Sequence, residues 1–217
     1  MNKEIDLPES VRSRIEYKRR FRLREMYRAT VYAPGAMAKL MENKKNNLLD
    51  QNFVKRIQLA VTEVNGCALC SYGHAKMALR QGMKNDEINS FLSEDGGGKF
   101  IRAEEAKGIV FAQHFADSRG YPKQYAYDSL VEEYGEEKAT VILSGAQMML
   151  VGNMYGIPAS AFLSRLKGKP YNDSSLFYEL KMLMLGLLVL PIAMVHGFIR
   201  RFVGLPNKRF DTSPDEA

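Results

Sequence analysis

The sequence predicts an all-helical fold, and two observations support this. Between Phe53 and Val64 the apolar residues recur at the spacing of a helix with a wide buried face. No stretch shows the alternation of apolar and polar residues that is typical of a half-buried strand. With 217 residues, of which 46% are apolar and 26% charged, the chain can bury a core as one large domain or two repeated halves.

The chain begins with a basic segment, and residues 1–29 are predicted to form a separate N-terminal helical unit. Between Val11 and Arg28, eight Arg or Lys residues stand against Glu16 and Glu25, which predicts a helix with a solvated basic face. An anionic membrane surface is the second interpretation of these cations. Nucleic acid is not expected as a partner, because no stacking motif, zinc finger or recognition helix accompanies them.

Residues 30–170 are predicted to form the main helical domain. The expected helices cover residues 36–41, 53–64, 67–79, 87–92, 103–116 and 124–134, followed by a helical stretch over 135–149. Glycine and proline predict the breaks between them, at Pro34-Gly35, Gly82, Gly96-Gly97-Gly98 and Gly120-Tyr121-Pro122.

This domain contains a faint internal repeat. A shift of eighty-six positions aligns three pairs of identical residues, namely Gly66 with Gly152, Ala75 with Ala161 and Gly82 with Gly168. Each half places an apolar helix before its first glycine and a helix ending in glycine after it. We therefore predict a degenerate duplication in which Asn153, Gly156 and Ser160 occupy the places of Cys67, Cys70 and His74.

Residues 171–217 are predicted to form an apolar C-terminal helix and a polar tail. Residues 182–199 contain no Asp, Glu, Lys or Arg, while Lys181 precedes them and Arg200 and Arg201 follow. This length is at the lower limit for a membrane span, and Pro191 and His196 are unusual in a simple spanning helix. Two interpretations stay open: helices buried in an oligomer interface, and a helix in or across a membrane.

The reactive side chains gather in one short stretch. Cys67 and Cys70 are the only cysteines, and His74 follows Cys70 by four residues. On a helix these spacings place all three side chains on one face. Asn65 or Gly66 is expected to end the preceding helix in a left-handed conformation, so that Cys67 opens the next one. The positive end of that helix would favour a thiolate.

Two thiols at this spacing support dithiol–disulfide chemistry. One thiolate attacks an oxidised substrate, the resulting sulfenic acid condenses with the second thiol, and an external dithiol reduces the disulfide. His74 could exchange the proton, and Glu63 could orient or relay it. A zinc site with Cys67, Cys70 and His74 as ligands, and a buried inert thiol pair, are the two other interpretations. The redox chemistry itself requires no organic cofactor and no metal.

The stretch Asn65-Gly66-Cys67-Ala-Leu-Cys70-Ser-Tyr-Gly-His74, after an apolar helix, resembles the alkyl hydroperoxidase D / carboxymuconolactone decarboxylase family. The resemblance covers about residues 30–168. It implies an all-helical bundle, a homo-oligomer that is trimeric or a multiple of three, and thiol-dependent peroxide reduction. It also implies that Cys70 is the peroxidatic thiol, Cys67 the resolving thiol and His74 the histidine of a proton relay.

Two positions depart from the family's peroxidases. Lys55 stands where they carry a glutamate, twelve residues before the first cysteine, and Leu69 stands where they carry a histidine. Glu63 is the candidate replacement for the missing carboxylate. The branch of the family that decarboxylates a lactone lacks the thiol pair, so that reaction is not expected here.

Together these features predict a thiol-dependent peroxidase or dithiol–disulfide oxidoreductase that reduces alkyl hydroperoxides. A small thiol or a dithiol protein is its expected electron donor. A cytoplasmic location is predicted, because the chain opens without an apolar signal segment and two cysteines are too few for a secreted disulfide framework. Membrane association through the apolar C-terminal segment is part of this expectation. The alternative is a non-enzymatic helical protein bound to a membrane or partner, with a redox-switch or vestigial thiol pair.

Overall fold

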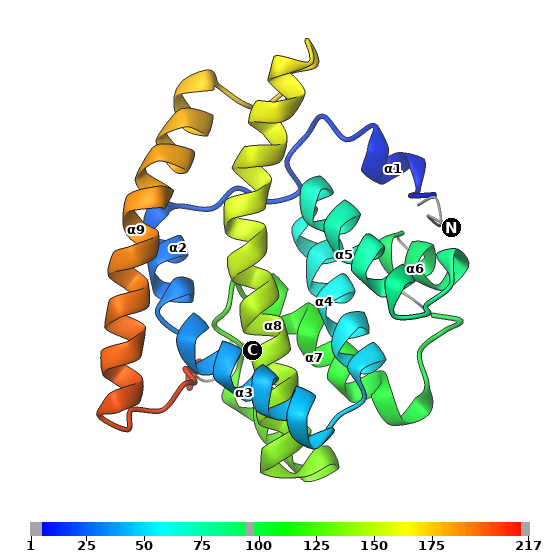
Figure 1. The fold of residues 1–217 in the computed structure, drawn as a ribbon, viewed down its shortest axis with the longest axis vertical. Helices are drawn as coiled ribbons and strands as arrows, with labels where there is room; N and C mark the ends of the chain where they lie inside the picture. The colour runs from blue at the N-terminus through cyan, green and yellow to red at the C-terminus, as the bar shows by residue number, and fades with distance from the viewer. Residues whose placement is uncertain (1–5, 94–97, 214–217) are drawn as a thin grey trace.

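Figure 1 shows the computed structural model, which describes residues 6–93 and 98–213. In chain order the helices are α1 (Glu9–Arg12), α2 (Leu23–Thr30), α3 (Ala33–Asn46), α4 (Gln51–Asn65), α5 (Ala68–Arg80), α6 (Asn85–Leu92), η1 (Ala103–Glu105), α7 (Ala106–Asp117), α8 (Gln124–Leu166) and α9 (Leu176–Phe202). Within these ranges the only β structure is an isolated bridge between Lys123 and Asp211. The predicted all-α fold is therefore confirmed. Gly96 and Gly97 of the predicted glycine turn lie outside the described residues.

The long helix α8 lies at the centre of the bundle. In Figure 1 it runs down the middle of the view, with α9 on one side and α4 and α5 on the other. Ile142, Leu150 and Met154 of α8 are fully buried, as are Ile57 and Leu59 of α4. This core fixes α4 and the start of α5 against α8, where the cysteines lie.

Most predicted helices are confirmed, but the repeat has a different layout from the one expected. Gly66, in a left-handed conformation (φ 73°), separates α4 from α5. Gly152 lies inside α8, which continues without a break through that position. Both copies still end near a left-handed glycine, Gly82 after α5 and Gly168 after α8. The second copy is therefore one helix where the first is two. The break in α8 is at Gly135, whose φ of 76° is non-helical.

The predicted single helix over residues 11–28 is wrong. Helix α1 ends at Arg12, α2 begins at Leu23, and the chain between them is irregular. An irregular path lets consecutive cations reach partners on three different elements: Lys18 pairs with Glu63 of α4, Arg19 with Asp117 of α7, and Arg20 stacks on Tyr178 of α9. These cations are therefore bound to the bundle and do not form one solvated face. The predicted domain boundaries at residues 29 and 170 stay predictions.

A buried ion cluster joins α4 to the segment before α7. Arg56, which is 3% exposed, donates two hydrogen bonds to the carboxylate of Glu105 (2.7 and 2.8 Å). A third hydrogen bond reaches Glu87 of α6 (2.7 Å). Burial opposes the charge of the guanidinium, but these two carboxylates outweigh it and raise the pKa of Arg56.

The apolar C-terminal segment forms the single helix α9, and Pro191 lies inside it. Among the described residues it is the one helix whose length and composition would allow it to cross a membrane. The prediction of an apolar C-terminal helix is therefore confirmed. Most residues of its apolar stretch are exposed.

Candidate redox-active site

The two cysteines open α5 as a disulfide. Cys67 is the N-cap residue, and its sulfur bonds to that of Cys70, with the Cα atoms 5.2 Å apart. The backbone N–H of Cys70 donates a hydrogen bond to Cys67 Sγ (3.2 Å). The predicted cap at Gly66 and the predicted start of a helix at Cys67 are thus both confirmed. A negative charge on Cys67 would face the positive end of α5.

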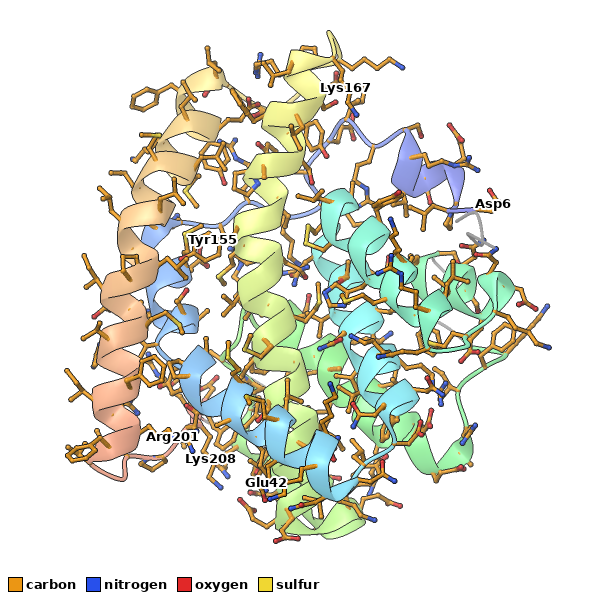
Figure 2. All side chains as sticks on the ribbon, viewed as in Figure 1. Asp6, Glu42, Tyr155, Lys167, Arg201 and Lys208 are labelled. Carbon is orange, nitrogen blue, oxygen red and sulfur yellow. A yellow bond between two sulfur atoms is a disulfide. The ribbon has the colours of Figure 1, made fainter. Side chains whose placement is uncertain are left out.

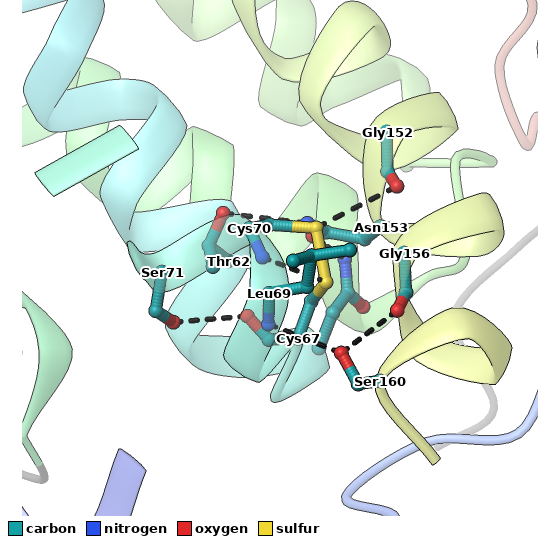
Figure 3. The surroundings of a disulfide bond; sticks show 10 residues. Thr62, Cys67, Leu69, Cys70, Ser71, Gly152, Asn153, Gly156 and Ser160 are labelled. Atoms are coloured by element: carbon teal, nitrogen blue, oxygen red, sulfur yellow. Dashed lines mark hydrogen bonds between the residues drawn. A yellow bond between two sulfur atoms is a disulfide. The ribbon is translucent and has the colours of Figure 1, made fainter. Parts of the chain in front are cut away.

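The disulfide packs directly against α8, as Figure 3 shows. Cys70 Sγ lies 3.6 Å from the carbonyl oxygen of Gly152. A Cβ atom added at Gly156 would lie 2.5 Å from Cys70 Sγ and 2.6 Å from Cys67 Sγ, closer than any real Cβ contact. Only glycine therefore leaves room for both sulfurs at this turn of α8.

Residues of α8 in the second copy of the repeat form hydrogen bonds with residues on either side of Cys67 in the first copy. Asn153 accepts a hydrogen bond from Asn65 (2.9 Å) and donates one to Thr62 (3.4 Å). The hydroxyl of Ser160 accepts from the backbone N–H of Leu69 (3.1 Å). These contacts, and the role of Gly156, were not predicted. The shift of eighty-six positions is the sequence signal for them, because it pairs Gly156 with Cys70.

The two cysteine residues differ in exposure. Cys67 is fully buried, whereas Cys70 is partly exposed. Cys70 is therefore the residue of the pair that is open to solvent.

His74 lies one turn beyond Cys70 and lines a cavity of about 460 Å³. Lys55 and Lys44 line the same cavity, together with the apolar side chains of Met37, Leu40, Met41, Val54, Met148 and Met149. The Nδ1 atom of His74 is buried and has no hydrogen-bond partner among the described residues. Burial, and next the positive charge of Lys55, lower the pKa of His74 to about 4. His74 is therefore neutral at pH 7, and its lowered pKa makes it a weaker base than an ordinary histidine.

Lys55 has an electrostatic effect opposite to that of the glutamate expected from the resemblance. Burial lowers its own pKa, and its Nζ donates a hydrogen bond to Gln58 (2.9 Å). A carboxylate at this position would favour a protonated His74, whereas Lys55 disfavours it. The second departure, Leu69, exposes 44% of its surface and brings no titratable group.

No hydrogen bond or ion pair joins Glu63 to Cys67, Cys70 or His74 in the described part of the chain. Its carboxylate forms an ion pair with Lys18, which also donates to its backbone oxygen (3.3 Å). The relay role expected for Glu63 stays a prediction. No group of three or more His, Cys, Asp or Glu side chains among the described residues is close enough to hold a metal, so the zinc interpretation finds no geometric support there.

Comparison with known protein families gives a match that includes α4 and α5. Residues 33–98 match the model of the Carboxymuconolactone decarboxylase family. This segment is similar to that family. The match confirms the resemblance seen in the sequence, over a shorter range than residues 30–168. No match to the chain was found among curated proteins or among solved structures. The Carboxymuconolactone decarboxylase segment contains Cys67, Cys70 and His74, while α8, which packs on the disulfide, lies outside it.

Two glycines of α8 provide a matched test of the packing around the disulfide in the Carboxymuconolactone decarboxylase segment. Gly156→Ala is expected to lower the free energy of unfolding by about 1–3 kcal/mol, because the new methyl group overlaps both sulfurs. Gly152→Ala, one turn earlier, is expected to raise it by about 0.5–1 kcal/mol, because its nearest neighbour would be 4.0 Å away and alanine favours a helix. Urea unfolding of both oxidised variants measures this difference. Shifts of the same sign and size would contradict it.

The buried His74 makes stability depend on pH. Between pH 6.5 and about 4 the unfolded chain binds a proton at His74 that the folded chain does not. The free energy of unfolding is therefore expected to fall as the pH is lowered through this window, by on the order of 3 kcal/mol relative to His74→Gln. Unfolding of both proteins across this range is the measurement. Parallel pH profiles would show that His74 keeps its ordinary pKa in the folded chain.

Proposed function

We propose that this chain is a dithiol–disulfide oxidoreductase that reduces hydroperoxides through Cys70 and Cys67. The observation that carries the proposal is the Cys67–Cys70 disulfide at the start of α5, in which Cys70 is partly exposed and Cys67 is buried at the helix terminus. The match of residues 33–98 to the model of the Carboxymuconolactone decarboxylase family supports it.

In the oxidative half-reaction, the thiolate of Cys70 attacks an oxygen of the hydroperoxide. A sulfur–oxygen bond forms, the oxygen–oxygen bond breaks, and the leaving alkoxide takes a proton to become an alcohol. The thiolate of Cys67 then attacks the sulfur of the Cys70 sulfenic acid, the disulfide forms, and the hydroxyl group leaves as water after protonation. Two electrons pass from the two thiols to the peroxide. His74, one turn beyond Cys70, is the candidate acceptor of the Cys70 thiol proton.

In the reductive half-reaction, a small thiol or a dithiol protein attacks Cys70, because Cys70 is the residue of the pair that is open to solvent. Cys67 leaves as a thiolate. The hydrogen bond from the Cys70 N–H and the positive end of α5 stabilise that thiolate. A second donor thiol then attacks the mixed disulfide, which releases the oxidised donor and restores the Cys70 thiol.

The test is consumption of cumene hydroperoxide by the reduced chain. The parent is expected to lose two thiols for each peroxide consumed, and to turn over when dithiothreitol is added. Cys67→Ser is expected to consume one equivalent and stop as a sulfenic acid that dimedone labels at Cys70. Cys70→Ser is expected to consume none. Consumption by Cys70→Ser at the rate of the parent would overturn the proposal.

A further inference from the structure

The helix α9 is attached to the bundle along one side. Its buried residues recur at three- to seven-residue spacings, namely Glu179, Met182, Gly186, Ala193 and Gly197. At its start Glu179 forms an ion pair with Arg165 of α8 (2.8 Å). Near its end His196 hydrogen-bonds to Tyr27 of α2 (2.8 Å). In the middle, a Cβ at Gly186 would lie 3.2 Å from the sulfur of Met26. The inner side is therefore held at both ends and in between.

The opposite side of α9 is apolar and exposed over its whole length. Its 27 residues extend for about 40 Å. The side chains more than half exposed are Phe177, Met184, Leu187, Leu188, Ile192, Val195, Phe198, Ile199 and Phe202. In Figure 2 this side of the helix faces away from the bundle, with Arg201 at its lower end. Val203 and Leu205, also exposed, extend the apolar surface beyond the helix. A continuous apolar patch of this length marks a binding surface.

Cations border this surface. Lys181 lies near one end of the helix and Arg201 at the other, and both are exposed. Neither forms an ion pair with another described residue. The chain carries a net charge of +6, which adds to the attraction for an anionic partner.

We infer that the outer face of α9 binds the surface of an anionic lipid bilayer, with the helix lying in the plane of the membrane. Acyl chains cover the exposed aliphatic and aromatic side chains, and Lys181 and Arg201 meet the phosphate groups. This inference goes beyond the proposed redox function and does not depend on it.

The chemistry of the face favours lipid over a second copy of this chain. Protein interfaces carry about one hydrogen bond per 100–200 Å² and have a polar rim. Residues 182–199 offer one polar side chain, His196, and it is already bonded to Tyr27. The inner contacts favour the in-plane orientation over a spanning one. A helix that crossed the bilayer would have to leave the bundle and expose the charge of Glu179.

The test is flotation of the full chain with vesicles of phosphatidylcholine mixed with phosphatidylglycerol, and with vesicles of phosphatidylcholine alone. The parent is expected to float with the anionic vesicles and to bind the neutral ones more weakly. The double variant Leu187→Gln with Ile192→Gln is expected to bind at least about 100-fold more weakly, because two apolar side chains that the acyl chains would cover are lost. Lys181→Gln with Arg201→Gln is expected to lose about fivefold for each cation on anionic vesicles only.

Val110→Gln is the matched control, because Val110 is as exposed as Ile192 (62% each) but lies on α7. Val110→Gln is expected to float like the parent. Cys70→Ser is also expected to float like the parent, because the inference about α9 does not use the thiol chemistry. Circular dichroism verifies that each variant is folded.

Alkaline carbonate is expected to release the bound chain, and retention would overturn the in-plane orientation. Absence of vesicle binding, or a soluble dimer that only the Leu187 and Ile192 substitutions dissociate, would overturn the inference.

Discussion

Arg56→Met is expected to lower the free energy of unfolding by about 3–5 kcal/mol, because it leaves the buried carboxylate of Glu105 without its partner. Glu87, which also bonds to Arg56, loses its charge partner in the same substitution. For a chain of this size the melting temperature should fall by about 10 °C. Thermal and urea unfolding of the oxidised protein measure the effect.

The exposed pair between Lys107 and Glu133 is the matched control for this cluster. Its nitrogen–oxygen distance is 3.0 Å, but the two side chains are 49% and 45% exposed. Lys107→Met is therefore expected to cost less than about 1 kcal/mol. A double variant, Arg56→Met with Glu105→Leu, should recover part of the loss, because it removes both buried charges together. Equal losses for Arg56→Met and Lys107→Met would show that burial does not determine the cost.

Lys55→Glu is expected to raise the pKa of His74 from about 4 toward 6.5 or above. The substitution removes a nearby positive charge and introduces the carboxylate found in the family's peroxidases. A histidine whose pKa lies near the working pH is a better general acid and base, so peroxide consumption at pH 7 should increase about tenfold or more. Nuclear magnetic resonance titration of His74 and the cumene hydroperoxide assay measure the two effects separately.

Two further variants assign the effect to its cause. Lys55→Met removes the charge alone and is expected to raise the pKa of His74 by a smaller amount. Lys44→Glu changes the charge of an exposed residue in the same cavity and is expected to leave His74 nearly unchanged. If the pKa rises in Lys55→Glu while peroxide consumption stays at the parent rate, proton transfer through His74 does not limit the reaction.

The local features of this site could be predicted from the sequence because neighbouring residues determine them. The apolar period of α4, the left-handed Gly66 and the helix start at Cys67 all depend on spacings of a few residues. The family match over residues 33–98 includes this short stretch.

The remaining features depend on contacts between distant parts of the chain. Residues 13–22 form no helix because Lys18 and Arg19 find partners on α4 and α7, and propensity cannot anticipate such partners. The contact of Gly156 with both sulfurs joins positions more than eighty residues apart. The orientation of the apolar face of α9 depends on the inner contacts of Gly186 and Gly197, which a list of apolar residues does not distinguish.

Adjacent residues of α8 face two different neighbours. Gly156 contacts the sulfurs of Cys67 and Cys70, while the ring of Tyr155 lies against Gly186 of α9, between the two helices in Figure 2. One turn of α8 thus separates the disulfide from α9, and its two faces have different packing partners. A substitution at Gly156 and a substitution at Tyr155 therefore test the two contacts separately.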